Sequence, residues 1–333
     1  MIGALLSFTS CSFFGLGSDD DSDSGPSLTE LLDGMPDVKF DLVVTETETA
    51  RYTYNSEYSD PFVEDEWFED DLKNVYEGLI TGMKNSVRDY IKDNSIEDNT
   101  AFKVEDFFEV DGYDNPYMHA GKYELTGNGI KIYITLDLED LKLDNTPEKP
   151  RLQMYIHHYL EEGNTEYSTE YLLAFTGTDV LNDFYYRYDE EEKKSIVYEE
   201  WDEPDNNDEW IYRNNNYYEY EIVDTNYSNF SLYHTEVDTT DNTKLEKNVR
   251  LLYTREAGYH VWQKNFAAEP VEEEQLFYNL SDNGALDTTY TSWPDDFKTA
   301  QEEWPAYAAE QVEKYDIRDI LPASDSPGFA DLY

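Results

Sequence analysis

The sequence has few cationic residues and almost no cysteine. Its 333 residues include 24 Lys and Arg against 75 Asp and Glu, which gives a formal net charge of −51, and its single cysteine is Cys11. A chain this negative repels the phosphates of nucleic acids, so we expect no nucleic-acid partner. One cysteine cannot form an intrachain disulfide or a zinc site built from several thiolates.

Long apolar runs are absent as well. No stretch of about 18 apolar residues occurs, so the sequence predicts no membrane-spanning helix. The chain has instead 30 Tyr, 16 Phe and 6 Trp. Aromatic side chains bury about 150–250 Å² each, which supplies a core, and the polar tip of Tyr suits strands with one wet face. The composition therefore predicts a folded, tyrosine-rich β protein in spite of its charge.

The first eleven residues are short, apolar and free of charge, and they end in Thr9, Ser10 and Cys11. This segment resembles the end of a bacterial lipoprotein signal peptide, although Phe8 stands where Leu is usual and no basic region precedes it. The resemblance implies that the Cys11 thiol is lipidated and becomes the mature N-terminus. We interpret residues 1–11 as a truncated signal segment, which a start codon assigned too late would explain.

Residues 12–35 have the Ser, Asp and Gly composition of an acidic linker. Asp19, Asp21, Asp23 and Glu30 match positions 1, 3, 5 and 12 of a calcium-binding EF-hand loop, but Ser24 stands where that loop requires Gly. We therefore expect a linker with no discrete metal site and no cofactor. Diffuse binding of cations to the acidic surface stays open.

One long amphipathic helix is predicted over about 66–92. Its apolar residues, such as Leu72, Leu79 and Met83, follow steps of three and four. Acidic residues gather at its start and cations at its end, as the helix dipole favours. Short C-terminal helices are predicted from Pro294, with a break at Pro305, followed by a loose tail over 322–333.

The rest of the chain alternates as β-strands do, beginning with strands over 38–63. Strands this close together, with no helical segment between them, must run antiparallel. We predict a mainly β, β-rich α+β fold: a large curved antiparallel sheet or half-closed barrel, with the long helix on its concave face. Residues 36–321 would form one domain, and a division near 144–150 is the alternative. The later candidate strands are 102–110, 117–125, 130–138, 152–160, 166–175, 184–188, 195–201, 209–213, 217–223, 230–237, 248–254, 260–266 and 275–280.

Few residues point to catalysis. The acidic run 202–205 lies between Trp201 and Trp210, and a carboxylate pair beside aromatic rings could serve a glycosidase. Carboxylates are so common in this chain that we favour a solvated turn between two strands. His157 and His158 are consecutive in a predicted strand, so they should point to opposite faces and cannot hold one metal together. His119, His234 and His260 are isolated. We assign no catalytic, metal-binding or cofactor-binding residue.

We therefore expect a non-enzymatic protein of the bacterial cell envelope that is lipid-anchored through Cys11 and binds a ligand or partner on its curved sheet. It would be extracytoplasmic, in the outer membrane or at the cell surface. One alternative is an extracytoplasmic glycan hydrolase with a carboxylate pair, and another is a structural surface protein without a pocket.

Overall fold

The structure is a computed structural model that describes most of the chain after residue 25. Cys11, Asp19, Asp21 and Asp23, and the strands predicted over 39–63, lie outside the described residues. The described residues are 26–38, 78–110, 113–137, 151–176, 182–204, 210–224, 227–241, 243–255, 258–279, 295–315, 317–322, 326 and 328–332.

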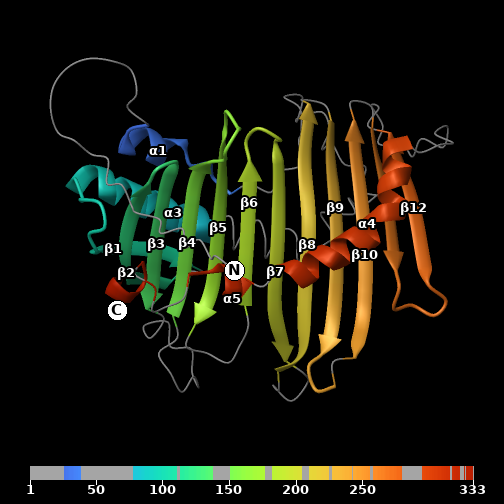
Figure 1. The fold of residues 1–333 in the computed structure, drawn as a ribbon. Coiled ribbons are helices and arrows are strands. Elements are labelled where there is room, and N and C mark those ends of the chain that lie inside the picture. Colours follow the sequence, from blue (N-terminus) through green and yellow to red (C-terminus); the bar gives the residue numbers. More distant parts are fainter. Residues whose placement is uncertain are drawn as a thin grey trace, which may run out of the picture.

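Twelve strands form one antiparallel sheet in which each strand pairs with its neighbours in sequence (Figure 1). Apart from the connection between β3 and β4, the connections are too short for parallel crossovers, so the chain folds back at these strand ends. The strands are β1 (Phe102–Val110), β2 (Tyr113–Thr126), β3 (Gly129–Asp137), β4 (Arg151–Leu160), β5 (Tyr167–Thr176), β6 (Asn182–Asp189), β7 (Lys194–Pro204), β8 (Trp210–Asp224), β9 (Tyr227–Asp238), β10 (Lys244–Arg255), β11 (Gly258–Asn265) and β12 (Glu272–Asn279).

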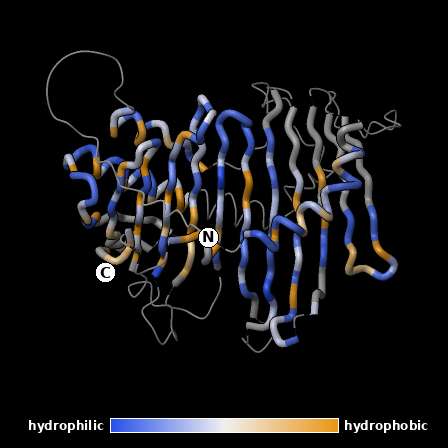
Figure 2. The backbone as a smooth tube through the Cα atoms, in the orientation of Figure 1, coloured by the Kyte–Doolittle hydropathy of each residue, from blue (hydrophilic) through white to orange (hydrophobic). Residues whose placement is uncertain are grey.

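The predicted antiparallel, mainly β architecture is confirmed, but the half-closed barrel is wrong. The sheet stays open, with β1 at one end of the strand order and β12 at the other. Helices cover parts of both faces (Figure 1), so apolar side chains are buried without closure of the sheet. Figure 2 shows hydrophobic and hydrophilic positions interspersed along the strands rather than gathered in one apolar layer.

One face of the sheet, which we call the α3 face, packs against α1 (Leu28–Gly34) and α3 (Gly78–Asn94). In α3, Ile80, Met83 and Val87 are fully buried, as their spacing of three and four residues requires. The helix predicted over 66–92 is therefore seen from residue 78 onwards. Residues 66–77 lie outside the described part, so its full length stays a prediction.

Residues 26–38, which we call the clasp, hold α1 against the sheet. Ser27 and Glu30 form a capping box at the start of α1: the Glu30 N–H donates to the Ser27 hydroxyl at 3.3 Å, and the Ser27 N–H donates to the Glu30 carboxylate at 2.7 Å. Leu31 and Leu32 are buried in the core. The linker predicted over 12–35 is therefore wrong for its last ten residues, because these apolar side chains fold onto the sheet.

Ion pairs and hydrogen bonds join the clasp to α3 and to the sheet. Lys92 pairs with Asp33 at 2.7 Å. The buried ammonium of Lys84 donates to the Pro36 carbonyl at 3.1 Å and pairs with Asp37. Burial lowers the pKa of Lys84, although Asp37 opposes that shift. Lys84 and Lys92, which the sequence pattern places near the C-terminal end of the helix where its dipole favours cations, therefore also bind the clasp.

The opposite face, which we call the α4 face, packs against the C-terminal segment. The helix α4 (Asp295–Lys314) crosses in front of β8, β9 and β10 in Figure 1. The predicted break at Pro305 does not occur, because the buried residues on either side, Trp304 and Ala308, hold the helix on the sheet. The Trp304 indole N–H also donates to the Leu232 carbonyl at 3.2 Å.

The predicted loose tail is also wrong for its described residues. After α5 (Ile317–Ile320), the chain ends in the 3₁₀ helix η3 (Ala330–Leu332). Phe329 is fully buried and meets the Tyr133 ring edge-on at 5.2 Å. A Cβ on Gly328 would lie 2.1 Å from that ring, so only Gly permits this approach.

The buried His158 predicts a measurable dependence of stability on pH. Burial lowers its pKa from 6.5 to about 4, and His157 adds a smaller effect. As the pH falls, the His158 imidazole takes up a proton in the unfolded chain before it does so in the folded protein. The contribution of neutral His158 to the free energy of unfolding is therefore complete above pH 6.5 and is lost as the pH falls through 4. Between pH 7 and 4.5 the parent should lose about 2 kcal/mol more unfolding free energy than His158→Gln. Urea unfolding measures this difference, and equal losses would contradict it.

Candidate functional site

A row of tyrosines crosses the α4 face. Directly paired positions on β3 to β9 carry, in order, Tyr133, Tyr155, Leu172, Tyr185, Tyr198, Tyr217 and Tyr233. All of these side chains are buried. Tyr315, directly after α4, places its ring 5.3 Å from Tyr185 and 5.9 Å from Tyr217. The C-terminal segment and the tyrosine row therefore form one aromatic layer.

Tyrosine hydroxyls on this face donate to glutamates. Tyr217 and Tyr307 both donate to the Glu219 carboxylate, at 2.7 and 2.6 Å. Other donors are Tyr133 to Glu124 at 3.5 Å, Tyr159 to Glu161 and to Glu170 at 3.4 Å each, Tyr185 to Glu170 at 3.1 Å, and Tyr198 to Glu200 at 3.5 Å. Tyrosine hydroxyls thus supply hydrogen-bond donors to several of the carboxylates that have too few cations to pair with.

A second row, two residues along each strand and so on the same face, carries charged groups. Its members on β4, β5, β6 and β8 are His157, Glu170, Arg187 and Glu219, and Ile196 occupies the β7 position. We call these four charged or titratable residues the polar strip. They are less deeply buried than the tyrosine row: the side chains of His157 and Glu170 are each 21% exposed. The polar strip is therefore partly accessible to solvent.

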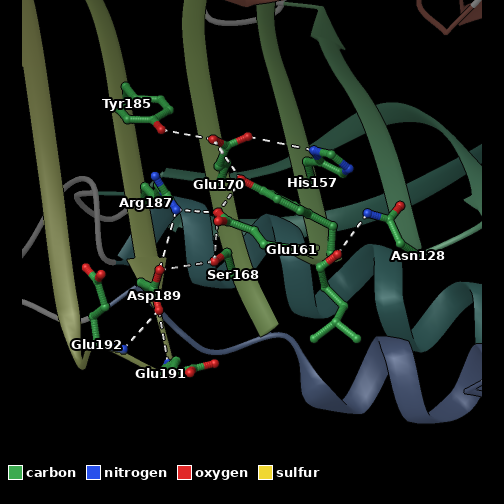
Figure 3. A network of polar contacts seen from close by, with 12 residues as sticks. Asn128, His157, Glu161, Ser168, Glu170, Tyr185, Arg187, Asp189, Glu191 and Glu192 are labelled. Atoms are coloured by element: carbon green, nitrogen blue, oxygen red, sulfur yellow. Dashed lines mark hydrogen bonds and ion pairs between the residues drawn. The ribbon is translucent and has the colours of Figure 1, made fainter. Parts of the chain in front are cut away.

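Glu170 is the centre of the network drawn in Figure 3. Its carboxylate accepts the Tyr185 hydroxyl and lies 3.7 Å from the His157 imidazole. Burial by itself raises the pKa of Glu170, but the hydrogen bonds from His157 and Tyr185 outweigh it, so the pKa is lowered. Glu170 is therefore a fixed negative charge at neutral pH.

Arg187 holds two further carboxylates beside the strip (Figure 3). Its guanidinium pairs with Glu161, and it lies 3.4 Å from Asp189. The Ser168 hydroxyl lies 3.4 Å from both of these carboxylates. Asp189 also accepts the N–H groups of Glu191 and Glu192 at 3.0 Å each, which fixes the turn after β6.

Glu161 and Asp189 lie near each other, and glycosidases use carboxylate pairs about 5–10 Å apart. The place between them, however, is filled by the Arg187 guanidinium and the fully buried Ser168. A sugar ring cannot enter there without displacing both. The arrangement therefore orients charge and does not present a cleft between two acids.

The acidic run beside Trp201, which we considered for a carboxylate pair, is described only at 202–204. Strand β7 continues to Pro204, so Trp201 lies on the α3 face and Asp202 on the α4 face. Asp202 accepts two hydrogen bonds from Arg213, at 2.9 and 3.3 Å. Asp205 and the side chains of Glu203 and Trp210 lie outside what the structure describes. The solvated turn that we considered at 202–204 is therefore a paired strand end.

The histidine prediction is confirmed at 157 and 158. His157 lies on the α4 face near Glu170, whereas His158 is buried on the α3 face, where its Nδ1 is 2.8 Å from the Thr169 hydroxyl. His234 is on the α3 face, with Nδ1 2.8 Å from the Asn216 amide oxygen. The side chains of His119 and His260 lie outside the described part.

The sequence pattern missed a group of buried amides in the middle of β8. The predicted strands 209–213 and 217–223 leave Asn214–Asn216 outside any strand, and Asn is uncommon in strands. The strand instead runs through, with Asn214 and Asn216 only 2% exposed. The Asn216 amide donates to Glu199 at 3.5 Å, and Asn215 accepts the Tyr198 hydroxyl at 2.7 Å. Partners on neighbouring strands therefore override the local preference.

In the described part of the chain, no three His, Cys, Asp or Glu side chains are grouped so that they could hold a metal ion. No helix there has the length and apolar character needed to cross a membrane. No protein-family model, curated protein or solved structure matches the chain. The geometry of the α4 face is therefore the main guide to function.

Proposed function

We propose that the protein is a lipid-anchored, non-enzymatic component of the bacterial cell envelope that binds a polar ligand or protein partner at the polar strip. The anchor is the Cys11 thiol, which stands at the end of an apolar run and is the only cysteine in the chain. The carrying observation for binding is the strip itself, whose partly exposed charges are held in a fixed pattern on a sheet face.

The strip is suited to binding because its geometry is set before any ligand arrives. Glu219 accepts hydrogen bonds from Tyr217 and Tyr307 and pairs with Lys194 at 2.7 Å. Glu170 is held in the same way by His157 and Tyr185. Fixed partners lower the entropy that these side chains lose on binding, which favours affinity.

A polar partner fits the structure better than an apolar one. The apolar side chains of the α3 face are buried beneath the clasp and α3, and Ile80, Met83 and Val38 are completely inaccessible. The tyrosine row of the α4 face is buried as well. The accessible strip carries carboxylates, an imidazole and a guanidinium, which recognise charged groups or hydroxyls.

The anchor is tested by fractionating the organism that carries the gene at its own locus. The parent should be recovered with the membranes and should partition into detergent, because lipidated lipoproteins carry more acyl chains than the single one that anchors only marginally. Cys11→Ala should appear in the aqueous phase or remain an unprocessed precursor. Equal partitioning of the parent and the variant would contradict the anchor.

Binding at the strip is tested by photo-crosslinking in the same cells. A benzophenone amino acid replaces Tyr307, which is 40% exposed and lies next to Glu219, or, as a control, the exposed Asp93 at the end of α3 on the other face. A discrete adduct from position 307 and none from position 93 supports the proposal. No adduct at 307, or the same adducts at both positions, would contradict binding here and favour a structural surface protein.

A further inference from the structure

We propose that the clasp mounts the sheet end-on to the membrane, with the turns beside α1 nearest the bilayer and the turns at the other end of the strands directed away from it. This inference rests on the proposed anchor at Cys11 and adds the orientation in which the anchored protein stands. It identifies which turns of the sheet lie furthest from the membrane.

The antiparallel order places alternate turns at opposite ends of the sheet. The turns after β2, β4 and β6 lie at one end, which we call the α1 end, and the turns after β9 and β11 lie at the other. α1 sits beside the end of β4: a Cβ on Gly34 would be 3.3 Å from the His158 ring. Figure 1 shows α1 level with the turn that joins β4 to β5.

The clasp cannot move along the strands without breaking buried contacts. Lys84 is 1% exposed, and its ammonium would be left without the Pro36 carbonyl and the Asp37 carboxylate. The Tyr171 hydroxyl, from the middle of β5, also donates to the Pro36 carbonyl. Ser27, the last point before the chain leads back to Cys11, is therefore fixed at the α1 end.

The point at which the connection joins the fold makes the α1 end the nearer one. Ser27 follows Cys11 by sixteen residues, which span at most about 55 Å when fully extended. A ten-residue strand such as β4 is about 33 Å long, so the far turns lie roughly a strand length further from the anchor on average. The net charge of −51 also opposes a sheet lying flat on anionic lipid.

The orientation is tested on vesicles with the full chain. Because Cys11 is the only cysteine, the protein is coupled through it to a maleimide lipid in phosphatidylcholine–phosphatidylglycerol vesicles, whether or not cells lipidate this residue. A donor dye is attached through an azide-bearing amino acid at the exposed Glu162, at the α1 end, or at the exposed Thr240, at the far end. The acceptor dye is on the lipid headgroups.

Energy transfer should be about twofold or more stronger from position 162 than from position 240, since a strand length separates the two ends. As a control, Cys11→Ser with Ala267→Cys moves the coupling point to an exposed turn at the far end and should reverse the order. Equal transfer from both positions with Cys11 coupling, together with reversal in the control, would overturn the proposal. A stronger signal from position 240 would also overturn it. Failure of lipidation in cells would leave this result unchanged, so the two proposals can fail separately.

Discussion

The hydrogen bond from a tyrosine hydroxyl to a glutamate is the interaction on which this sheet depends. The chain has 75 carboxylates and only 24 basic side chains, so ion pairs cannot match most of its negative charges. On the α4 face, tyrosine hydroxyls donate hydrogen bonds to these carboxylates instead: Tyr185 donates to Glu170, and Tyr217 donates to Glu219. Their rings meanwhile supply the buried apolar surface that aliphatic residues would provide elsewhere. One residue type thus supplies both the core and hydrogen-bond donors for the carboxylates.

Several of the few Arg and Lys side chains lie in two kinds of place. They pair with partly buried carboxylates of the sheet, or they join the clasp to α3. Arg187 bridges Glu161 and Asp189 beside the polar strip, and Arg213 holds Asp202 at the end of β7. Lys84 and Lys92 join the clasp to α3. These cations connect the fold with the proposed function. They fix the polar strip, which would bind a partner, and the clasp, which would lead to the membrane anchor.

Much of the fold could be predicted from local patterns. Alternation and turn residues located nearly every strand, and the short connections required antiparallel pairing. Errors arose where tertiary contacts override local preference: Asn214–Asn216 continue β8, Pro305 lies inside α4, and Phe329 docks on Tyr133. A half-closed barrel was one of two predicted forms of the sheet, because the sequence does not reveal that α4 and the clasp cover opposite faces.

The candidate site was almost invisible in the sequence. Glu170 and Arg187 resemble dozens of other charged residues in this chain, and only strand register brings them together with His157. The opposite orientation of His157 and His158 was predictable, because it follows from strand geometry alone. The partner of a given Glu is set by the register between neighbouring strands, and composition offers no signal for that register.

The most direct measurement is a titration of tyrosine absorbance near 295 nm. Burial, with a contribution from the neighbouring carboxylates, raises the pKa of Tyr133 and Tyr307 to about 12 and shifts the pKa of Tyr185 and Tyr217 upward as well. A phenol in the unfolded chain ionises near pH 10. At pH 11 the folded protein should therefore keep a class of protonated tyrosines that the urea-unfolded chain has lost. Coincident folded and unfolded curves, with circular dichroism showing an intact sheet, would contradict the account.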